Sequence, residues 1–467
     1  MRFPLALTAK IAAHIVKHKV RRTPKFAMVL QLEPLHTCNL TCTGCGRIRE
    51  YSTSLKDMMS LGDCLESANE CDAPMVSICG GEPLIYPKIE ELVAGILGQG
   101  RIVYICTNGM FMRKKMRDYL AKIYSPEIES KIAKLVSEKL ISDKDAESIR
   151  KGKNDSRPVI APSKWMYWNV HIDGLEYTHD LIVEREGVFK ECVEAIRMAK
   201  ILGYQVATNT TVYKETDAKE IEEMFEYFSA LEVDGHTISP GYEYDAAKKD
   251  MVSRLGKQPE DFFLTRKMTR QKFSKIEEWG QRFTIFGTVV YQEFLAGKRE
   301  LTCTAWAIPT RNVKGWKAPC YLMTDGHYPR YDEMLSKVDW EKYGVVDGVA
   351  RDARCENCMV HCGYDPSGAL SPKLSDSWKN MRYNFGAKPK PYYAGLKVNA
   401  FNGTSIGKGH LAEAKAAINS PRAAMNGAQS VFFRKEENHT HESGGSCETG
   451  DTTQRDELLA KINKTNV

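Results

Sequence analysis

Three cysteines, Cys38, Cys42 and Cys45, follow the apolar run Met28–Leu32 with the spacing Cys-x3-Cys-x2-Cys. Three thiolates on one short loop can hold three corners of a cubic iron–sulfur cluster and leave the fourth iron without a protein ligand. Such an open iron can bind a substrate or cofactor. A zinc knuckle fits less well, because a closed tetrahedral site needs a fourth ligand and none lies nearby. The spacing therefore indicates a cluster that takes part in chemistry.

A second motif, Gly80-Gly81-Glu82-Pro83, ends another apolar run. Its two glycines let a ligand approach the backbone closely, and Glu82 offers a carboxylate to an ammonium group. On its own, a glycine turn before a proline is a common loop signal and identifies no function. Combined with the cysteine loop at this distance, however, the motif resembles the radical S-adenosylmethionine (SAM) superfamily.

That resemblance implies a cofactor and a co-substrate. In the superfamily, the open iron of a [4Fe-4S] cluster binds the amino and carboxylate groups of SAM, and the Gly-Gly-Glu-Pro segment contacts the amino group. An electron from the cluster cleaves SAM to methionine and a 5′-deoxyadenosyl radical. One position departs from the pattern: the residue before the last cysteine is usually aromatic, and here it is Gly44. This difference affects how the cysteine loop would pack beside the adenine of SAM. It does not affect the three cysteines that the resemblance gives as cluster ligands.

The composition favours a large intracellular protein. The chain has 467 residues, 42% of them hydrophobic, and a net charge of +6, which predicts two domains plus tails. That charge is modest for the length and gives no reason to expect nucleic acid as a partner. The 14 cysteines, without a signal peptide, predict metal sites in a reducing cytoplasm rather than disulfides. No run approaches the ~20 apolar residues of a membrane span.

Residues 1–27 predict a basic amphipathic helix. Leu7, Ile11 and Ile15 recur at helical spacing. Basic residues surround this stripe: Arg2, Lys10, Lys17, Lys19, Arg21, Arg22 and Lys25. Such a helix can lie peripherally on the anionic inner face of a bacterial membrane. Alternatively, it packs its stripe on the rest of the protein and turns its lysines to solvent.

Residues 28–245 alternate short apolar runs with longer amphipathic stretches, which predicts an α/β fold with a parallel sheet. Six strands are expected, at Val29–Pro34, Met75–Ile78, Ile102–Thr107, Trp168–Ile172, Gln205–Val212 and His236–Ser239. Six units match the partial (β/α)6 barrel of radical SAM enzymes, and the motifs fall at the carboxyl ends of strands, where such folds bind ligands. Residues 120–163 read as a helical insertion, with helices around Glu127–Lys139 and Asp143–Lys151.

Further SAM-binding candidates end the later strands. Asn108 belongs to a Thr-Asn-Gly that the superfamily commonly places near SAM. His171 and Asp173 share one face of the fourth strand by period-two alternation. Asn209 and Ser239, on the fifth and sixth strands, are candidates for the ribose or adenine. Each of these residues can equally be a satisfied polar group at the mouth of a barrel.

A second cysteine set lies beyond the barrel, in a cysteine-rich extension at 246–365. It comprises Cys303, Cys320, Cys355, Cys358 and Cys362. The pattern resembles the auxiliary-cluster extension of many radical SAM proteins, shortened to one cluster. The resemblance gives the first four cysteines as ligands and leaves Cys362 or His361 spare. A structural zinc site is the alternative. Residues 366–467 are rich in polar residues, Gly and Pro, which predicts a largely disordered tail in which Cys447 has no role.

The stretch from Met1 to Tyr364 is also similar to one subfamily, the hopanoid-biosynthesis radical SAM proteins that act as adenosylhopane synthases. The similarity is carried by Leu32–Leu35, Cys38–Gly46, Ile238–Tyr244, Gly315–Trp316, Pro319–Leu322 and Cys355–Tyr364. It implies that the deoxyadenosyl radical adds to the terminal alkene of diploptene, a C30 triterpene. A tertiary carbon radical results, which needs one more hydrogen atom to become adenosylhopane.

Cys106 is the candidate donor of that hydrogen, because it ends a strand directly before Asn108. A thiol S–H bond is weaker than the tertiary C–H bond formed, so transfer to carbon runs downhill. The thiyl left behind needs a proton and an electron, which an auxiliary cluster fed by a flavodoxin- or ferredoxin-type donor could relay. A buried apolar cysteine is the alternative reading. The rival functions are a radical SAM peptide maturase and a non-catalytic iron–sulfur protein that binds SAM.

Overall fold

The computed structural model describes residues 2–50, 57–152 and 156–389. Predictions for residues 390–467, including the one for Cys447, lie outside the described residues.

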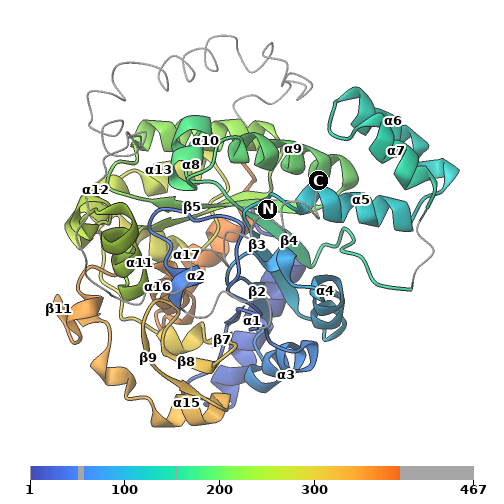
Figure 1. Cartoon of the computed structure of the whole chain (residues 1–467). Helices are drawn as coiled ribbons and strands as arrows, with labels where there is room; N and C mark the ends of the chain where they lie inside the picture. The colour runs from blue at the N-terminus through green and yellow to red at the C-terminus, as the bar shows by residue number, and fades with distance from the viewer. Residues whose placement is uncertain (1, 51–56, 153–155, 390–467) are drawn as a thin grey trace, which may run out of the picture.

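Six parallel strands form the centre of the protein (Figure 1). They are β1 (Val29–Leu32), β2 (Met75–Ile78), β3 (Ile102–Thr107), β4 (Met166–His171), β5 (Gln205–Val212) and β6 (Gly235–Pro240). Each pairs with the next in parallel register, for example Leu32 with Ile78 and Ile78 with Ile105. All six predicted strands are present within two residues of their expected bounds, and the α/β fold class is confirmed.

Helices follow the strands and cover the outside of the barrel (Figure 1). They are α3 (Leu61–Cys71), α4 (Ile89–Gly98), α5 (Met112–Lys122), α8 (Glu176–Ile182), α9 (Val188–Leu202) and α10 (Ala218–Ala230). Alternation along each strand separates two environments. Ile78, Ile105 and Val206 are fully buried in the core cluster, whereas Ser77 and Cys106 line a cavity inside the barrel.

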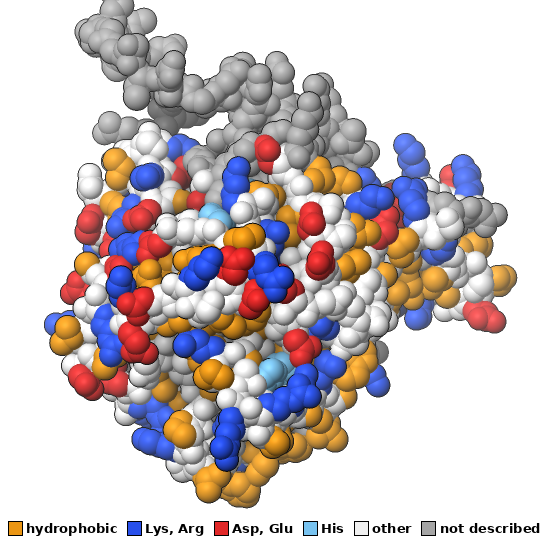
Figure 2. Space-filling model, turned by 90° about the horizontal axis from the view of Figure 1, so that it is seen from below, with side chains coloured by type: hydrophobic (Ala, Val, Ile, Leu, Met, Phe, Trp, Pro, Cys, Tyr) orange, Lys and Arg blue, Asp and Glu red, His pale blue; other side chains and the backbone are white. Residues whose placement is uncertain are grey.

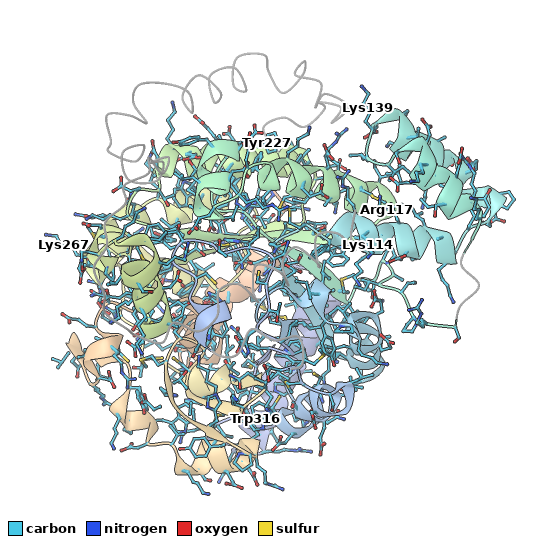
Figure 3. All side chains as sticks on the ribbon, viewed as in Figure 1. Lys114, Arg117, Lys139, Tyr227, Lys267 and Trp316 are labelled. Carbon is cyan, nitrogen blue, oxygen red and sulfur yellow. The ribbon has the colours of Figure 1, made fainter. Side chains whose placement is uncertain are left out.

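The predicted helical insertion is present at the edge of the barrel. It contains α6 (Glu129–Ser137) and α7 (Asp143–Arg150), close to the expected ranges. Arg117 of α5 holds α7 through an ion pair with Asp145 at 2.6 Å, and Lys139 lies on the part that extends away from the barrel (Figure 3).

The extension adds its strands to the same sheet. β7 (Thr310–Asn312) pairs in parallel with β1, and β8 (Gly315–Pro319) and β9 (Thr324–Tyr328) continue the sheet in antiparallel fashion. A separate hairpin joins β10 (Val345–Val346) to β11 (Val349–Ala350). Trp316, labelled in Figure 3, is fully buried and donates from Nε1 to Glu70 at 2.8 Å. The extension is therefore continuous with the barrel.

Helices of the extension surround these strands. They are α11 (Asp245–Asp250), α12 (Arg266–Lys272), α13 (Ile276–Arg282), α14 (Val289–Leu295), α15 (Tyr331–Lys337), α16 (His361–Leu370) and α17 (Leu374–Phe385). The last two correct one prediction. Residues 366–389 were expected to begin a disordered tail, yet α16 runs past residue 366 and α17 follows it. Asp376 on the inner side of α17 pairs with Arg299 at 3.0 Å and fastens this helix, a contact that composition alone does not reveal.

At the N-terminus, α1 (Leu5–Val20) packs its predicted stripe inward. Leu7 is fully buried against Tyr104 and Tyr167, near the starts of β3 and β4, and Ile11 packs against the same cluster. His14 Nε2 lies 2.9 Å from the carbonyl oxygen of Ala27. Of the two alternatives for this stripe, the structure has the packed one. Among the described helices, none combines the length and apolarity of a membrane span.

The face seen in Figure 2 shows acidic and basic side chains interspersed between patches of hydrophobic ones. This distribution matches the modest net charge of +6.

Candidate active site

The loop after β1 brings together the three cysteines that the sequence singled out. Cys38, Cys42 and Cys45 are half-buried, carry free thiols and line a cavity of about 980 Å³. The backbone N–H of Cys45 donates to the carbonyl of Cys42 at 3.1 Å, which holds the end of the loop in a turn. Burial raises the pKa of the Cys42 thiol, and Cys45 and Cys38 raise it further. Thiolates in this position therefore need a cation to offset their charge, which suits bound iron.

The Gly-Gly-Glu-Pro turn docks directly on this loop. The N–H of Gly81 donates to Leu35 O at 3.1 Å, and that of Glu82 donates to Thr37 O at 2.9 Å. Gly80, Gly81 and Glu82 line the cavity, and Pro83 starts a short 3₁₀ turn, Pro83–Ile85.

Glu82 makes contacts that the sequence did not predict. Its carboxylate accepts from Thr107 Oγ1 at 2.7 Å, from the Asn108 N–H at 2.8 Å and from the Leu84 N–H at 3.0 Å. Burial raises the pKa of Glu82 to about 7 despite these bonds. Glu82 therefore ties the end of β2 to the end of β3, and Asn108 reaches the cysteine loop through Asn39 Oδ1 at 2.8 Å.

His171 and Asp173 have different positions relative to the cavity. The His171 ring lines it, whereas Asp173 is fully buried behind the ring, with its Oδ2 2.6 Å from His171 Nε2. Asp173 Oδ1 also accepts from the Thr211 N–H at 2.7 Å, which fixes the carboxylate to β5. Burial lowers the pKa of His171, but Asp173 outweighs this effect and raises it overall. Asp173 thus orients His171 rather than facing the cavity itself.

The other candidates from the strand ends also line the cavity. Asn209 projects from β5, and Ser239 Oγ lies 2.7 Å from His361 Nδ1. Cys106 is half-buried, with its Sγ 3.1 Å from Ser77 Oγ and 3.4 Å from Asn169 Nδ2. Burial raises the pKa of Cys106, although Asn169 and Ser77 oppose the rise. The group at this position is therefore a protonated thiol near neutral pH.

One feature of the cysteine loop was missed by sequence reasoning. Gly44 has φ +80°, and a Cβ added there would lie 2.6 Å from Phe262 Cε1. Phe262, on the extension, stacks on Tyr213 with ring centroids 4.1 Å apart. An aromatic ring therefore does lie beside the loop, but it comes from more than 200 residues further along the chain. No local signal points to it.

Comparison of the sequence with family profiles gives two matches. Residues 32–128 match the radical SAM superfamily, which covers the cysteine loop, the Gly-Gly-Glu-Pro turn and Cys106. The radical SAM family model thus covers the segment that carries both motifs, 97 of the 467 residues. Residues 236–383 match a domain of unknown function, DUF3463, which covers the second cysteine set. A comparison with curated proteins finds no significant match.

Solved structures similar to this chain include two of SuiB from Streptococcus suis. One has a TM-score of 0.35 and 15% identity, covering 57% of this chain and 50% of SuiB. The other, bound to S-adenosylmethionine, has a TM-score of 0.40 and 15% identity, covering 65% and 62%. A structure of anSMEcpe with AdoMet and the Cp18Cys peptide has a TM-score of 0.41 and 14% identity, covering 76% and 96%. This chain thus spans one half to two thirds of the SuiB chains.

The described residues fit the cofactor of the superfamily. The loop supplies three thiols facing a cavity with room for a further ligand, as a [4Fe-4S] cluster with one open iron requires. Cys38, Cys42 and Cys45 would hold this cluster, and SAM would occupy the adjoining space lined by Gly80, Gly81 and Asn108. When bound, the cluster supplies the electron that cleaves SAM.

The second cysteine set surrounds its own small cavity. Cys303, Cys320, Cys355, Cys358 and Cys362 all line a space of about 30 Å³, which Tyr242, Tyr343 and Tyr364 also border. Gly363 contacts this group closely, since a Cβ there would lie 2.4 Å from Cys303 Sγ. His361, which the resemblance left spare, faces the large cavity beside Ser239. The structure therefore brings the five cysteines of the second set around one small space.

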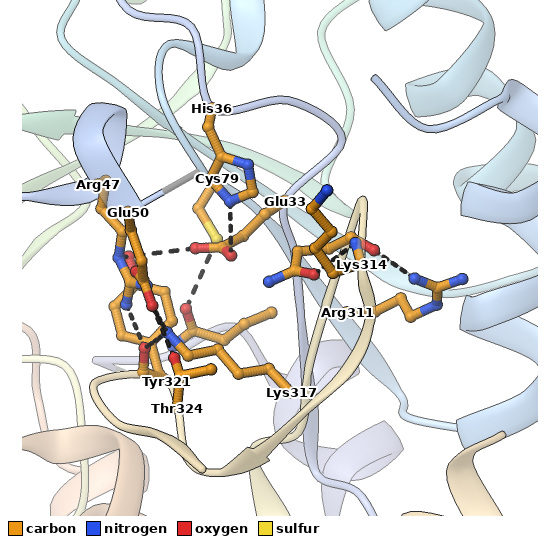
Figure 4. Close-up of polar contacts among 12 residues, drawn as sticks. Glu33, His36, Arg47, Glu50, Cys79, Arg311, Lys314, Lys317, Tyr321 and Thr324 are labelled. Carbon is orange, nitrogen blue, oxygen red and sulfur yellow. Dashed lines mark hydrogen bonds and ion pairs between the residues drawn. The ribbon is translucent and has the colours of Figure 1, made fainter. Parts of the chain in front are cut away.

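A buried ionic network joins the two cysteine sets (Figure 4). Arg47, two residues after Cys45, pairs with Glu50 at 2.7 Å and Glu33 at 3.7 Å, and its guanidinium also donates to the carbonyl oxygen of Tyr321. Lys317 of β8 donates to that same carbonyl at 2.9 Å and pairs with Glu50 at 2.7 Å. Tyr321 directly follows Cys320, so the network connects the two cysteine-bearing segments.

Proposed function

We propose that this radical SAM enzyme adds the 5′-deoxyadenosyl group of SAM to the terminal alkene of diploptene, giving adenosylhopane in hopanoid lipid biosynthesis. The observation that carries the proposal is the position of Cys106. A protonated thiol lines the same cavity as the cluster cysteines and the SAM-binding turn. The subfamily motifs of the sequence supply the identity of the substrate.

The cavity suits a large substrate with two chemically different ends. Its volume of about 980 Å³ lies at the upper end of the roughly 300–1,000 Å³ typical of ligand pockets. Near Cys106 its lining is polar, with Ser77 and Asn169. Toward α1 it becomes apolar; there it is lined by Phe3, Ile11, Ile15, Met28 and Phe286. A nucleoside and a hydrocarbon skeleton could meet where these two parts join.

The atoms and electrons of the proposed reaction balance as follows. One electron from the reductant breaks the S–C5′ bond of SAM and gives methionine and the 5′-deoxyadenosyl radical. Addition of its 5′ carbon to the terminal alkene carbon forms one C–C bond and leaves the unpaired electron on the tertiary carbon. Cys106 then transfers its S–H hydrogen to that carbon, which gives the saturated product and a thiyl. One electron and one proton restore the thiol, so each turnover needs a reductant of the flavodoxin or ferredoxin type.

Two further parts belong to the proposal. The second cysteine set holds an iron–sulfur cluster that returns the electron to Cys106, with structural zinc as the rival content. Because the substrate is a bilayer lipid, the enzyme works peripherally at a membrane surface.

The test is an anaerobic reaction of the reconstituted enzyme with SAM, reductant and diploptene, followed by mass spectrometry of the lipids. Adenosylhopane is the expected product. Deoxyadenosine without an adenosylated lipid would exclude this substrate and leave the peptide maturase hypothesis. No cleavage of SAM at all would support the non-catalytic hypothesis.

A further inference from the structure

Exposed apolar side chains concentrate on the first and last described helices. Seven of the ten large hydrophobic residues that are exposed in the described residues lie on α1 and α17. They are Leu5, Val16 and Val20 on α1, and Leu374, Trp378, Met381 and Phe385 on α17. This stripe of α1 is distinct from the buried one that contains Leu7.

The spacing shows that each set forms one face of its helix. On α17, the intervals of four, three and four residues between Leu374 and Phe385 keep all four side chains on one side. On α1, the exposed Ala9 and Ala12 fill the gap between Leu5 and Val16 at the same intervals. Such continuous apolar faces are uncommon on the surface of a soluble monomer and mark a binding site.

The two helices adjoin and share contacts at their ends. The Arg2 N–H, just before α1, donates to Asn384 O at 3.0 Å. The Arg2 guanidinium also lies over the Tyr383 ring at 4.4 Å from its centroid. The two apolar faces therefore belong to one connected surface.

This surface forms part of the wall of the large cavity. Leu5 and Val16 from α1 and Met381 and Phe385 from α17 line the same space as Cys106. These apolar side chains are thus both exposed to solvent and in contact with the cavity. A hydrocarbon arriving here would meet apolar contacts from the protein surface inward.

Basic residues predominate beside the two faces, and the acids there are paired, Asp72 with Lys17 and Glu293 with Lys379. Residues 1–28 contain seven Lys and Arg residues and no Asp or Glu. On α17, the acid Asp376 is buried and paired with Arg299. Lys19, Arg21, Lys373 and Arg382 make no ion pair with any of the residues described in the structure. Positive charge that is not neutralised by the protein suits an anionic partner.

We propose that the joint surface of α1 and α17 docks on an anionic lipid bilayer, and that the apolar substrate passes from the bilayer between these helices into the cavity. A bilayer accounts for both observations, since it receives apolar side chains beneath a layer of headgroups that attracts the flanking cations. Trp378 has the amphipathic ring that favours this boundary. The route of the substrate rests on the proposed function, whereas the docking does not.

The experiment measures flotation of the full-length, reconstituted protein with vesicles of phosphatidylcholine, with and without phosphatidylglycerol. The test variant is Leu374→Glu/Trp378→Glu, because neither side chain lines the cavity. The matched control is Val252→Glu/Val349→Glu, which changes two exposed apolar residues elsewhere (50% and 68% exposed). Circular dichroism and the thermal midpoint verify that both variants fold.

We expect the wild-type protein to bind vesicles that contain phosphatidylglycerol. This binding should be about tenfold weaker in the test variant and unchanged in the control variant. Equal binding of all three proteins would overturn the proposal. The proposal would also be overturned if the wild type self-associated and the test variant did not, while both bound vesicles equally. The surface would then join two copies of the chain. The proposal would likewise be overturned if the full-length protein bound no vesicles and a variant lacking residues 390–467 did bind them, because that segment would then be the occupant of the apolar surface.

The design separates this proposal from the proposed function, because vesicle binding requires no turnover. Normal docking with no adenosylated lipid would refute only the reaction. Adenosylation of detergent-dispersed diploptene by a protein that never binds vesicles would refute the docking and the membrane-surface part of the proposed function, and would leave the reaction standing.

Discussion

Two groups of cysteines in this protein use the same side chain for different ends. The loop of Cys38, Cys42 and Cys45 supplies three thiols on the wall of a cavity of about 980 Å³. The second set supplies five thiols around a space of about 30 Å³. A cluster held by the first set would keep one iron open to a ligand in the cavity, whereas the space around the second set has no comparable room for a ligand. The comparison teaches that the space adjoining the thiols, and not only their number, decides whether a bound cluster could reach a substrate.

The largest effect is expected from removing one thiol of the first set, with removal of one thiol of the second set as the comparison. Cys42→Ala takes one of three ligands, so SAM cleavage should fall by about a thousandfold or more, roughly 4 kcal/mol of barrier. Cys362→Ala takes one of five, and most SAM cleavage should remain. Anaerobic release of 5′-deoxyadenosine measures both. Similar losses in the two variants would break the contrast between the sets.

Cys106→Ala tests the proposed hydrogen donor, which would receive its electron from the second cysteine set and act on the radical formed beside the first. SAM cleavage should persist, because this side chain is not a cluster ligand, but the saturated adduct should decrease at least about tenfold. Cys71→Ala, a buried cysteine of α3, is the control. In D2O the wild type should place one deuterium on the tertiary carbon. Adduct that forms normally in Cys106→Ala would remove this thiol from the mechanism.

Arg47→Met tests the connection between the two sets. The guanidinium is buried among Glu33, Glu50 and Tyr321, so its removal should cost about 3–5 kcal/mol of stability by leaving buried charges unpaired. Arg330→Met, in an exposed pair with Asp332, should cost less than about 1 kcal/mol. Unfolding midpoints and iron content, measured anaerobically, report the effect. A protein as stable as the control variant would show that the network contributes little.

Gly363→Ala perturbs the second set alone. An added Cβ would lie 2.4 Å from Cys303 Sγ, whereas at Gly326 nothing lies within 4 Å of it. We expect Gly363→Ala to lose about 1–3 kcal/mol and part of the metal of the second set, while Gly326→Ala retains both. Metal content reports on the second set, and release of 5′-deoxyadenosine reports on the first. Unchanged metal content in Gly363→Ala would contradict the placement of Cys303.

The smallest expected effect is a loss of stability at acidic pH that depends on Glu33. Burial alone would raise the pKa of Glu33, but Arg47 and His36 lower it from 4.5 to about 2. The folded state therefore holds this proton less tightly than the unfolded state, so its stabilisation is complete above pH 4.5 and is lost as the pH falls toward 2. Between pH 5 and pH 4 the loss should be about 0.7 kcal/mol. Glu33→Gln should remove this part of the slope in anaerobic denaturant titrations, and an identical slope would contradict the assignment.

The sequence predicted the strands and the ligand loop because local patterns determine both. Each strand is a short apolar run, and the three cysteines lie within eight residues of one another. The contacts that it missed depend on residues that are distant in the chain. Phe262 reaches Gly44 across the fold, and Asp173 lies behind His171 because Thr211 holds it there.

The C-terminal prediction failed for a related reason. A polar composition indicated disorder from residue 366, yet α17 forms, and its Asp376 pairs with Arg299, which lies 77 residues earlier in the chain. The exposed stripes of α1 and α17 were also missed, since only the structure shows which of the two apolar faces of α1 is covered.

The most direct test of the account is electron–nuclear double resonance on the reduced protein mixed with SAM that carries ¹⁵N in its amino group and ¹⁷O in its carboxylate. An iron position left open by the three loop thiols predicts hyperfine coupling of both labels to a four-iron cluster, and its disappearance in a variant lacking Cys38, Cys42 and Cys45. Absence of coupling in the wild type, or coupling that survives in that variant, would contradict it.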